Sequence, residues 1–448
     1  MNTPIADFVK KYAESDCLRF HMPGHKGKGA LGIESLDITE ISGADSLFEA
    51  NGIIAESEKN AGALFGANSF YSTEGSSLSI RAALYLFMLH AAKIGKKPLV
   101  LAGRNAHKVF ISASVLIDFE FEWLAPSKNS YLSCDISESE LSEKLALYSD
   151  RCVAVYVTSP DYLGRIADIK RISSICKTHN AVLIVDNAHG AYLKFLSESR
   201  HPIDLGADIS LDSAHKTLPV LTGGAYLHIS KNTPDIFAEN AKLALSLFGS
   251  TSPSYLILQS LDIANRYISN GFKERLNEFC NAVDNLKHEL ISKGFSLFGD
   301  EPLKITLDAK KYGYYGQELA DLIAEKGVVC EFADKDAVVF MLTPENGLGS
   351  LERLKDSLFS LPKKAEITDS APEYKQAKRA LTPKYAMLCE SETVDTENSE
   401  GRILCEFNVA CPPAVPIAVC GEIIDRNTIE RFEYYGIKKC RVVKNKPL

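Results

Sequence analysis

The sequence predicts an α/β fold built on a mostly parallel sheet. Between residues 98 and 229, short apolar runs that suit buried strands alternate with longer stretches that suit helices. Such alternation predicts parallel strands joined by right-handed crossovers. Two of the apolar runs, 181–185 and 207–211, end in clusters of polar residues. Ligands of open α/β sheets bind outside the carboxyl ends of the strands, so these two ends predict a ligand site.

The same patterns predict the individual elements. In the first part of the chain we expect strands at 98–102, 152–158, 181–185, 207–211 and 223–229, and helices at 7–12, 56–68, 78–92, 166–178 and from 255 onward. Beyond residue 295 we expect a compact α+β domain, with strands at 296–298, 303–307, 328–332 and 337–342 and helices at 316–326 and 351–361. The predicted organisation is an N-terminal segment (1–45), a large domain (46–294), a small domain (295–362), a linker (363–384) and a C-terminal domain (385–448), with one short helix expected within the polar stretch 363–382.

Composition excludes several classes of protein. The chain has 448 residues, of which 46% are hydrophobic and 24% charged, as in a globular protein of two or three domains. A net charge of −8 argues against a nucleic-acid partner or a membrane-binding basic face. No signal peptide or bilayer-spanning run is visible, so we expect a cytoplasmic protein. The eleven cysteines form no C-x-x-C pair or zinc-site spacing, which favours reduced thiols.

A lysine and an aspartate follow the two polar strand ends. The segment DSAHKT (212–217) places Lys216 beside Ser213 and His215, directly after the strand at 207–211. Asp186 follows the strand at 181–185. This pairing suits pyridoxal 5'-phosphate (PLP), because a lysine can form the Schiff base while an aspartate keeps the pyridine nitrogen protonated. A structural ion pair between Asp186 and Lys216 is the alternative.

Two further segments suit the same cofactor. The stretch STEGSS (72–77) precedes a predicted helix, where small hydroxyl residues and free backbone N–H groups can hold a phosphate, or can simply cap the helix. His107 follows the strand at 98–102, where an imidazole can stack on a pyridine ring or lie on the surface. His21 and His25 have a spacing seen in metal sites, but Pro23 and Gly24 between them break a helix, so we expect no metal.

Motifs spread over the chain resemble those of one known family. The segments FHMPGHKG (20–27), DITEISGAD (37–45), VDNAHGA (185–191) and DSAHKTL (212–218) are similar, in this order, to motifs of the PLP-dependent ornithine/lysine/arginine decarboxylases of the aspartate-aminotransferase fold. The resemblance is strongest over residues 19–262, and it is to the short form without an N-terminal wing domain. It implies PLP fold type I, with a seven-stranded type of sheet in the large domain and smaller α+β domains after it.

The resemblance also implies roles for single residues. It places the phosphate at the start of the helix after residue 74, His107 against the pyridine ring, and a second hydroxyl-rich loop on the phosphate of the neighbouring subunit. A homodimer, or a higher homo-oligomer, with shared active sites is therefore expected. The expected catalytic residues are Lys216, Asp186, His215 and His189, and the expected cofactor-binding residues are Lys216, Asp186, His107, Gly75, Ser76, Ser77, Ser213, His215, Ser250 and Thr251.

The chain departs from the family pattern at a few positions. Glu74 stands where the family has Asn, and Asp161 stands where Thr is commoner. The segment CPPAVP (411–416) replaces Tyr-Pro-Pro-Gly-Ile-Pro, and Cys420 replaces the Pro of Pro-Gly-Glu. These last changes fall near the substrate end of the family's site, so they bear on substrate choice.

The expected reaction is decarboxylation of arginine, lysine or ornithine to agmatine, cadaverine or putrescine, amines of polyamine biosynthesis. Lys216 or His215 would return the proton to Cα. A carboxylate would bind the distal cation of the substrate, with Asp45, Glu49 and Glu422 as candidates. Aminotransfer or β-elimination on the same fold is an alternative reaction. The altered segment 411–422 also leaves open a non-catalytic regulatory homologue.

Overall fold

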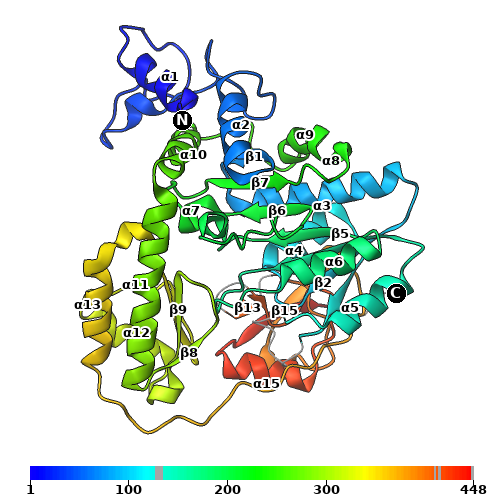
Figure 1. Ribbon diagram of the computed structural model, residues 1–448. Coiled ribbons are helices and arrows are strands. Elements are labelled where there is room, and N and C mark those ends of the chain that lie inside the picture. The colour runs from blue at the N-terminus through cyan, green and yellow to red at the C-terminus, as the bar shows by residue number, and fades with distance from the viewer. Residues whose placement is uncertain (127–134, 408–409, 412–414, 445–448) are drawn as a thin grey trace. The chain divides into compact units, whose positions relative to one another are not determined.

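Seven strands form one mixed sheet. The computed structural model describes residues 1–126, 135–407, 410–411 and 415–444 (Figure 1). The sheet order is β1-β7-β6-β5-β4-β2-β3. β7 is antiparallel to β1 and β6, whereas β5 is parallel to β6, and β2 is parallel to β3 and β4. The mostly parallel sheet predicted from the sequence is thus confirmed, with β1 Asn68–Ser72, β2 Pro98–Gly103, β3 Phe121–Leu124, β4 Cys152–Thr158, β5 Val182–Asp186, β6 Ile209–Asp212 and β7 Ala225–Ile229.

The chain divides into two compact units. The first unit comprises Met1–Lys97 and Ile169–Asn277, and the second comprises Pro98–Asp168 and Glu278–Leu448. This division is made by spatial contacts, and the finer boundaries predicted from the sequence stay a prediction. The helices of the first unit are α1 Pro4–Ala13, α2 Ile53–Phe65, α3 Gly75–Lys93, α6 Ile169–Thr178, α7 Ala214–Thr217, α8 Asp235–Glu239, α9 Ala241–Ser246 and α10 Tyr255–Ser269, while α11 Phe272–Lys293 continues into the second unit.

Helix α3 is the core helix of the first unit. It packs against β1, β5, β6 and β7, and also against α8 and α9. Its side chains are apolar almost all the way round, as expected for a helix that is covered on several sides. The sheet therefore holds the N-terminal end of α3, at Gly75, in a fixed place.

A buried carboxylate fastens the N-terminal helix to the first unit. Helix α1 begins at Pro4, a residue that suits the first helical position because it lacks an N–H. The free N–H groups of Ile5 and Ala6 donate to Asp262 Oδ2 of α10 at 2.9 and 3.0 Å, and Ser57 Oγ of α2 donates to Oδ1 at 2.6 Å. Burial raises the pKa of Asp262 to about 6. The contact holds α1, α2 and α10 together.

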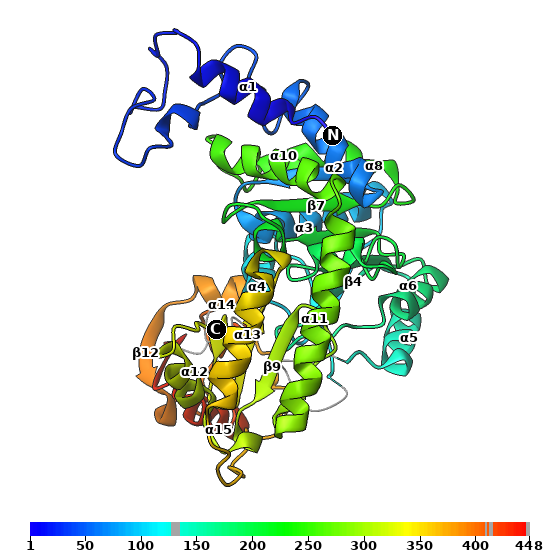
Figure 2. The ribbon, with the colours of Figure 1, turned by 60° about the vertical axis from the view of Figure 1, so that its left-hand side comes forward.

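The second unit contains a four-stranded antiparallel sheet with the order β10-β11-β9-β8. Helix α13 runs beside α11 (Figure 2), where Lys355 Nζ lies 3.3 Å from Glu289 Oε2. The α+β character predicted for the region after residue 295 is confirmed. Its elements are β8 Ser296–Phe298, β9 Lys304–Asp308, α12 Gly316–Ala324, β10 Phe332–Ala333, β11 Ala337–Met341 and α13 Gly347–Phe359.

The rest of the second unit lies before and after this sheet in the chain. Helices α4 Lys108–Ile117 and α5 Glu138–Leu147 precede it, and α14 Pro383–Leu388 and α15 Arg426–Tyr434 follow it. Strands β12 Ser391–Asp395 and β15 Lys439–Val443 pair antiparallel, as do the short β13 Ala410–Cys411 and β14 Val415–Pro416.

Two element predictions in this unit are wrong. The strand expected at 328–332 is reduced to Phe332–Ala333, because only these two residues pair with β11, and Val329 is 85% exposed. The short helix expected within 363–382 begins only at Pro383. Thr382 sets that start, since its Oγ1 accepts from the N–H of Tyr385 at 3.3 Å.

The described part of the chain also bears on the class of protein. None of its helices combines the length and the apolar character that crossing a bilayer requires. Each cysteine side chain that the structure describes is a free thiol, as expected from the spacing of the cysteines.

Candidate active site

The lysine and the aspartate singled out in the sequence follow neighbouring parallel strands. Asp186 is the last residue of β5 and lies opposite Leu211 of β6. The chain leaves β6 at Asp212 and enters α7, which carries His215 and Lys216. Because the carboxyl ends of parallel neighbours meet at one edge of a sheet, the two functional groups belong to the same edge. Asp186 is only 2% exposed, and Lys216 is partly buried.

The start of α3 reaches this edge. Ser213 Oγ, at the end of β6, donates to Ser76 Oγ at 2.9 Å, and the N–H of Gly75 donates to the carbonyl of Gly223 at 2.7 Å. Gly75 has a φ of +70°, and a Cβ built on it would lie 3.9 Å from His215 Cε1. The first N–H groups of a helix have no carbonyl one turn earlier and lie at the positive end of its dipole. The N–H groups and hydroxyls of Ser76 and Ser77 therefore suit an anionic group such as a phosphate, whereas the N–H of Gly75 is already bonded to Gly223.

His215 is held in one tautomer. Its Nδ1 lies 3.0 Å from the carbonyl oxygen of Gly224, and because this oxygen can only accept, Nδ1 carries the proton. Burial lowers the pKa of His215, the positive charge of Lys216 lowers it further, and the Gly224 carbonyl opposes both. The neutral imidazole therefore has an acceptor at Nε2 and no proton to give from that atom.

A buried aspartate ties the ends of β5 and β6 together. Asp212 is fully buried, and its Oδ1 accepts from Asn187 Nδ2 at 3.0 Å and from Ser210 Oγ at 2.7 Å, while its Oδ2 accepts from His201 Nε2 at 2.9 Å. Burial alone would raise its pKa, but the contacts with His201 and Ser210 hold the pKa below its usual value. Because Asn187 follows Asp186, this network positions the loop that carries Asp186.

Two histidines beside Asp212 were not singled out in the sequence. The ligand atoms of His201, Asp212 and His228 lie within 4.8 Å of one another, which is the arrangement of a possible metal cluster. His201 Nδ1 accepts from the N–H of Ile203 at 3.3 Å, so its Nε2 carries the proton that Asp212 binds. Burial lowers the pKa of His228 to about 3, which keeps it neutral. The irregular spacing of these residues gives no sequence signal, although a histidine within the apolar run at 225–229 is unusual.

The remaining predicted residues have different surroundings. His189 is buried after β5, whereas Ser250 and Thr251 are exposed. The N–H of Ser250 donates to Glu74 Oε1 of the same chain at 2.6 Å, so Glu74 binds this loop. His107 lies in the second unit, where its Nδ1 accepts from the N–H of Val109 at 3.2 Å as the cap of α4. The stacking role of His107 and the intersubunit role of Ser250 and Thr251 stay predictions.

Two of the three candidate partners for the distal cation of a substrate are occupied. The Asp45 carboxylate caps α2, and the backbone N–H groups lower its pKa although burial opposes them. Glu422 is 2% exposed and accepts from the N–H of Val419 at 2.7 Å, while Glu49 is exposed. The side chain of Cys411 and residues 412–414 lie outside the described residues. The donors to Asp45 are the N–H groups of Ser46, Asn51, Gly52, Ile54 and Ala55.

The two histidines of the early loop have separate partners. His21 Nε2 lies 2.6 Å from the hydroxyl of Tyr12, and His25 Nε2 lies 3.1 Å from Asp37 Oδ2. Each imidazole thus contributes to the local structure of residues 12–37.

Comparison with known proteins identifies the family. The sequence model of the "Orn/Lys/Arg decarboxylase, major domain" matches residues 3–307. The chain belongs to the Orn/Lys/Arg decarboxylase family. It is 28% identical to the "Uncharacterized protein YaaO" of Bacillus subtilis, over 96% of this chain and 94% of that one, and 26% identical to an arginine decarboxylase of Bacillus subtilis, over 95% and 92%.

Solved structures of a lysine decarboxylase and of another PLP enzyme share the fold. The lysine decarboxylase LdcF of Francisella novicida superposes with a TM-score of 0.78 at 15% identity, covering 99% of this chain and 81% of that chain. Serine palmitoyltransferase with its PLP internal aldimine superposes with a TM-score of 0.55 at 14% identity, covering 80% and 83%. The predicted PLP fold type I is thereby confirmed.

As a member of this family, the chain is a PLP-dependent amino-acid decarboxylase, a carboxy-lyase. The residues of the first unit fit the cofactor: an amine at Lys216, a carboxylate at Asp186, and the start of α3 for the phosphate. Bound PLP supplies an electron sink for the electron pair that remains when CO₂ leaves an amino acid.

Proposed function

We propose that this decarboxylase acts on a basic amino acid, with arginine as its preferred substrate and agmatine as the product. The decarboxylase assignment rests on the match to the family. The observation that supports the cofactor site is the position of Asp186 and Lys216 at neighbouring strand ends, next to the start of α3. The choice of arginine is supported by the arginine decarboxylases of Bacillus subtilis and Bacillus anthracis, which are 26% and 27% identical to the chain and 92% covered by it.

We assign a separate role to each side chain at the predicted site. Lys216 provides the amine that holds the cofactor's aldehyde, and Asp186 keeps the pyridine nitrogen protonated. The N–H groups and hydroxyls of Ser76 and Ser77 bind the phosphate, and Ser213 positions Ser76 through their 2.9 Å hydrogen bond. We assign the return of the proton at Cα to Lys216 Nζ, because the only proton of neutral His215 is held by the Gly224 carbonyl.

We also propose that two copies of the chain form a dimer with shared active sites. Apolar side chains along the N-terminal segment of the first unit support it, since Leu18 and Leu31 are each 80% exposed, Phe20 is 90% exposed and Met22 is 68% exposed. Exposed apolar groups that follow each other in this way mark an interaction surface. Light scattering on the purified chain tests the proposal, and a monomer at micromolar concentration contradicts it.

The substrate is tested by supplying the PLP-loaded chain with arginine, lysine and ornithine in turn. We expect CO₂ release and agmatine from arginine at a higher kcat/KM than for the other two amino acids. A higher kcat/KM for lysine or ornithine contradicts arginine as the substrate. A keto acid without CO₂ shows aminotransfer, and pyruvate shows β-elimination. The absence both of cofactor absorbance near 420 nm and of turnover shows a non-catalytic homologue.

A further inference from the structure

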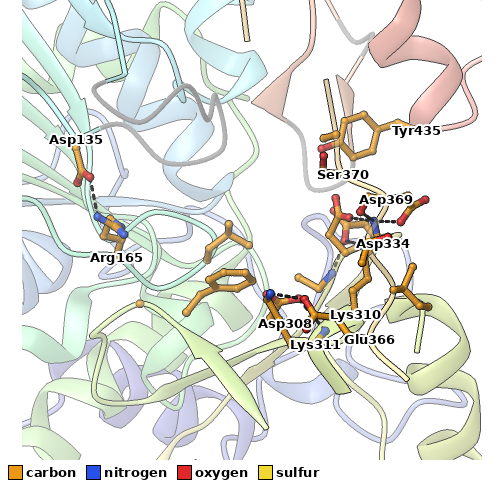
Figure 3. A pocket seen from close by; sticks show the side chains of 18 residues that line it. Asp135, Arg165, Asp308, Lys310, Lys311, Asp334, Glu366, Asp369, Ser370 and Tyr435 are labelled. Carbon is orange, nitrogen blue, oxygen red and sulfur yellow. Dashed lines mark hydrogen bonds and ion pairs between the residues drawn. The ribbon is translucent and has the colours of Figure 1, made fainter. Parts of the chain in front are cut away.

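The second unit encloses a pocket that none of the predicted site residues lines. Its volume is about 510 Å³, within the range of small-molecule sites. The walls come from the end of β9, the start of β11, the polar segment 366–371 and Tyr435 after α15 (Figure 3). All of these residues belong to the second unit.

The positive charges that line the pocket are already neutralised. Arg165 Nη1 lies 2.6 Å from Asp135 Oδ2. Lys310 Nζ lies 2.5 Å from Asp336 Oδ1 and 2.7 Å from Asp369 Oδ1, and Lys311 binds Glu366. Figure 3 shows these pairs around the pocket. An anionic ligand would therefore have to break existing ion pairs.

Two carboxylates at the same end of the sheet have no such partner. Asp334 is 8% exposed, and its Oδ1 accepts from the N–H groups of Asp336 and Ala337 at 2.8 and 2.7 Å. Within the described part of the chain, Asp334 Oδ2 has no hydrogen-bond partner. Asp308 forms no ion pair there, and its Oδ1 accepts from the N–H of Lys311 at 3.4 Å. Asp308 lies opposite Ala337 in the β9–β11 ladder, which brings it to the same end.

Both carboxylates are destabilised as anions. Burial raises the pKa of Asp334 to about 6, the charge of Asp336 adds to the rise, and Lys310 opposes it. Burial also raises the pKa of Asp308. A cation placed against these groups would supply the missing partner, because a buried carboxylate needs a positive charge or donors to offset its lost hydration.

The rest of the wall defines the kind of cation. Apolar parts of the pocket come from Leu163, Phe298, Ile367, Ala371 and Tyr435. A hydrated metal ion prefers a shell of oxygens and gains nothing from such walls. We propose that this pocket binds a small organic cation, an amine with an alkyl stem, whose charged end lies against Asp334 and Asp308. None of the residues expected to bind the cofactor lines this pocket.

The test is a calorimetric titration of the full chain with 1,5-diaminopentane. The chain is first loaded with PLP and reduced with borohydride, so that no aldehyde can react with the amine. We expect saturable binding that weakens at least about tenfold in Asp334→Asn and in Asp308→Asn, because each change removes a charge-assisted contact. The matched control is Asp356→Asn, an exposed aspartate of α13, and it should bind as the unmodified chain does. The uncharged 1-pentanol should not bind.

Three results would overturn the proposal: no binding of the diamine, an affinity in Asp334→Asn and Asp308→Asn that equals that of the unmodified chain, or binding of Ca²⁺ but not of the diamine. Asp334→Asn keeps an oxygen for both backbone N–H groups, so it should fold, and circular dichroism checks this. The absorbance of the reduced cofactor is recorded in the same sample. Failure of PLP to bind would therefore count against the proposed function alone, and failure of the diamine to bind would count against the pocket alone.

Discussion

Two buried aspartates, one in each unit, are placed alike and bonded differently. Asp212 ends β6 of the first unit, and Asp334 follows β10 of the second. Asp212 uses both oxygens to accept from Asn187, Ser210 and His201, and its pKa is lowered. Asp334 accepts on one oxygen only, and burial raises its pKa to about 6. Because both carboxylates are buried, the difference between their pKa values comes from the donors and charges around each of them.

The difference corresponds to two uses. A carboxylate whose acceptors are all engaged fixes the geometry of its neighbours, and Asp212 does this for the loop that follows Asp186. A carboxylate with an unused oxygen in a cavity remains available for a ligand, as we propose for Asp334. Changes in the first unit should therefore damage catalysis or folding, while loss of the charge at Asp334 should not damage folding.

The largest loss of activity is expected when the amine of Lys216 in the first unit is removed. Lys216→Ala should lower kcat/KM for decarboxylation by at least about 10³-fold, the order of loss that follows removal of a covalent catalytic group. The measurement is amine formation under saturating PLP. Lys231→Ala, an exposed lysine of the same unit, is the control and should keep its activity. Activity in Lys216→Ala within tenfold of the unmodified chain contradicts the assignment.

Removal of the fully engaged aspartate should be costly for folding. Asp212→Ala leaves the donors at Asn187, Ser210 and His201 buried without an acceptor. We expect the free energy of unfolding to fall by about 3–5 kcal/mol in urea titrations. Asp356→Ala should change it by less than about 0.5 kcal/mol. A loss below 1 kcal/mol for Asp212→Ala would show that its hydrogen bonds do not hold the strand ends.

Loss of the charge at Asp334 should raise the free energy of unfolding at neutral pH, whereas loss of Asp212 lowers it. Its pKa of about 6 in the folded chain lies above the value of about 3.9 for an unfolded aspartate, so the folded state holds the proton more tightly. Protonated Asp334 therefore contributes its full stabilisation below about pH 4. As pH rises through 6 the free energy of unfolding falls by up to about 3 kcal/mol. Asp334→Asn lacks this loss, so it should unfold at higher urea concentration than the unmodified chain at pH 7.5 but not at pH 4. A stability difference that does not change with pH would contradict this account of Asp334.

The smallest effect is expected at the helix cap. Asp45 accepts from backbone N–H groups at the start of α2, which places it with Asp212 among the engaged carboxylates. Asp45→Ala should lower the free energy of unfolding by about 1–2 kcal/mol. Asp45→Asn keeps an acceptor and should lose less. An equal loss in the two variants would mean that the carboxylate acts through its charge and not as a cap.

The sequence predicts the strand ends that carry Asp186 and Lys216 better than it predicts the hydrogen bonds of the buried Asp212. The strands β4, β5 and β6 are found within two residues, because buried parallel strands are apolar runs bounded by polar clusters. Lys216 and Asp186 are found because each follows such a run. The partners of Asp212 escape prediction, since residues 187, 201 and 228 meet only in the folded chain.

The second unit gives fewer local signals. The strand expected at 328–332 has β-favouring residues, but the ladder on β11 reaches only Phe332 and Ala333, so pairing overrides propensity. A local signal also misleads in the first unit: Asp45 is an attractive partner for a substrate cation by charge alone, and only the folded loop at 46–52 shows that its oxygens are occupied. The pocket at Asp334 combines segments around residues 163, 308, 334 and 369, which no sequence spacing connects.

The central claim is that the amine of Lys216 carries the cofactor. The most direct measurement is borohydride reduction of the PLP-loaded chain, followed by digestion and mass spectrometry of the pyridoxyl-labelled peptide. The account predicts one labelled peptide containing residues 212–217, with the label on Lys216. A label on another lysine, or an unlabelled chain that still releases CO₂ from arginine, would contradict it.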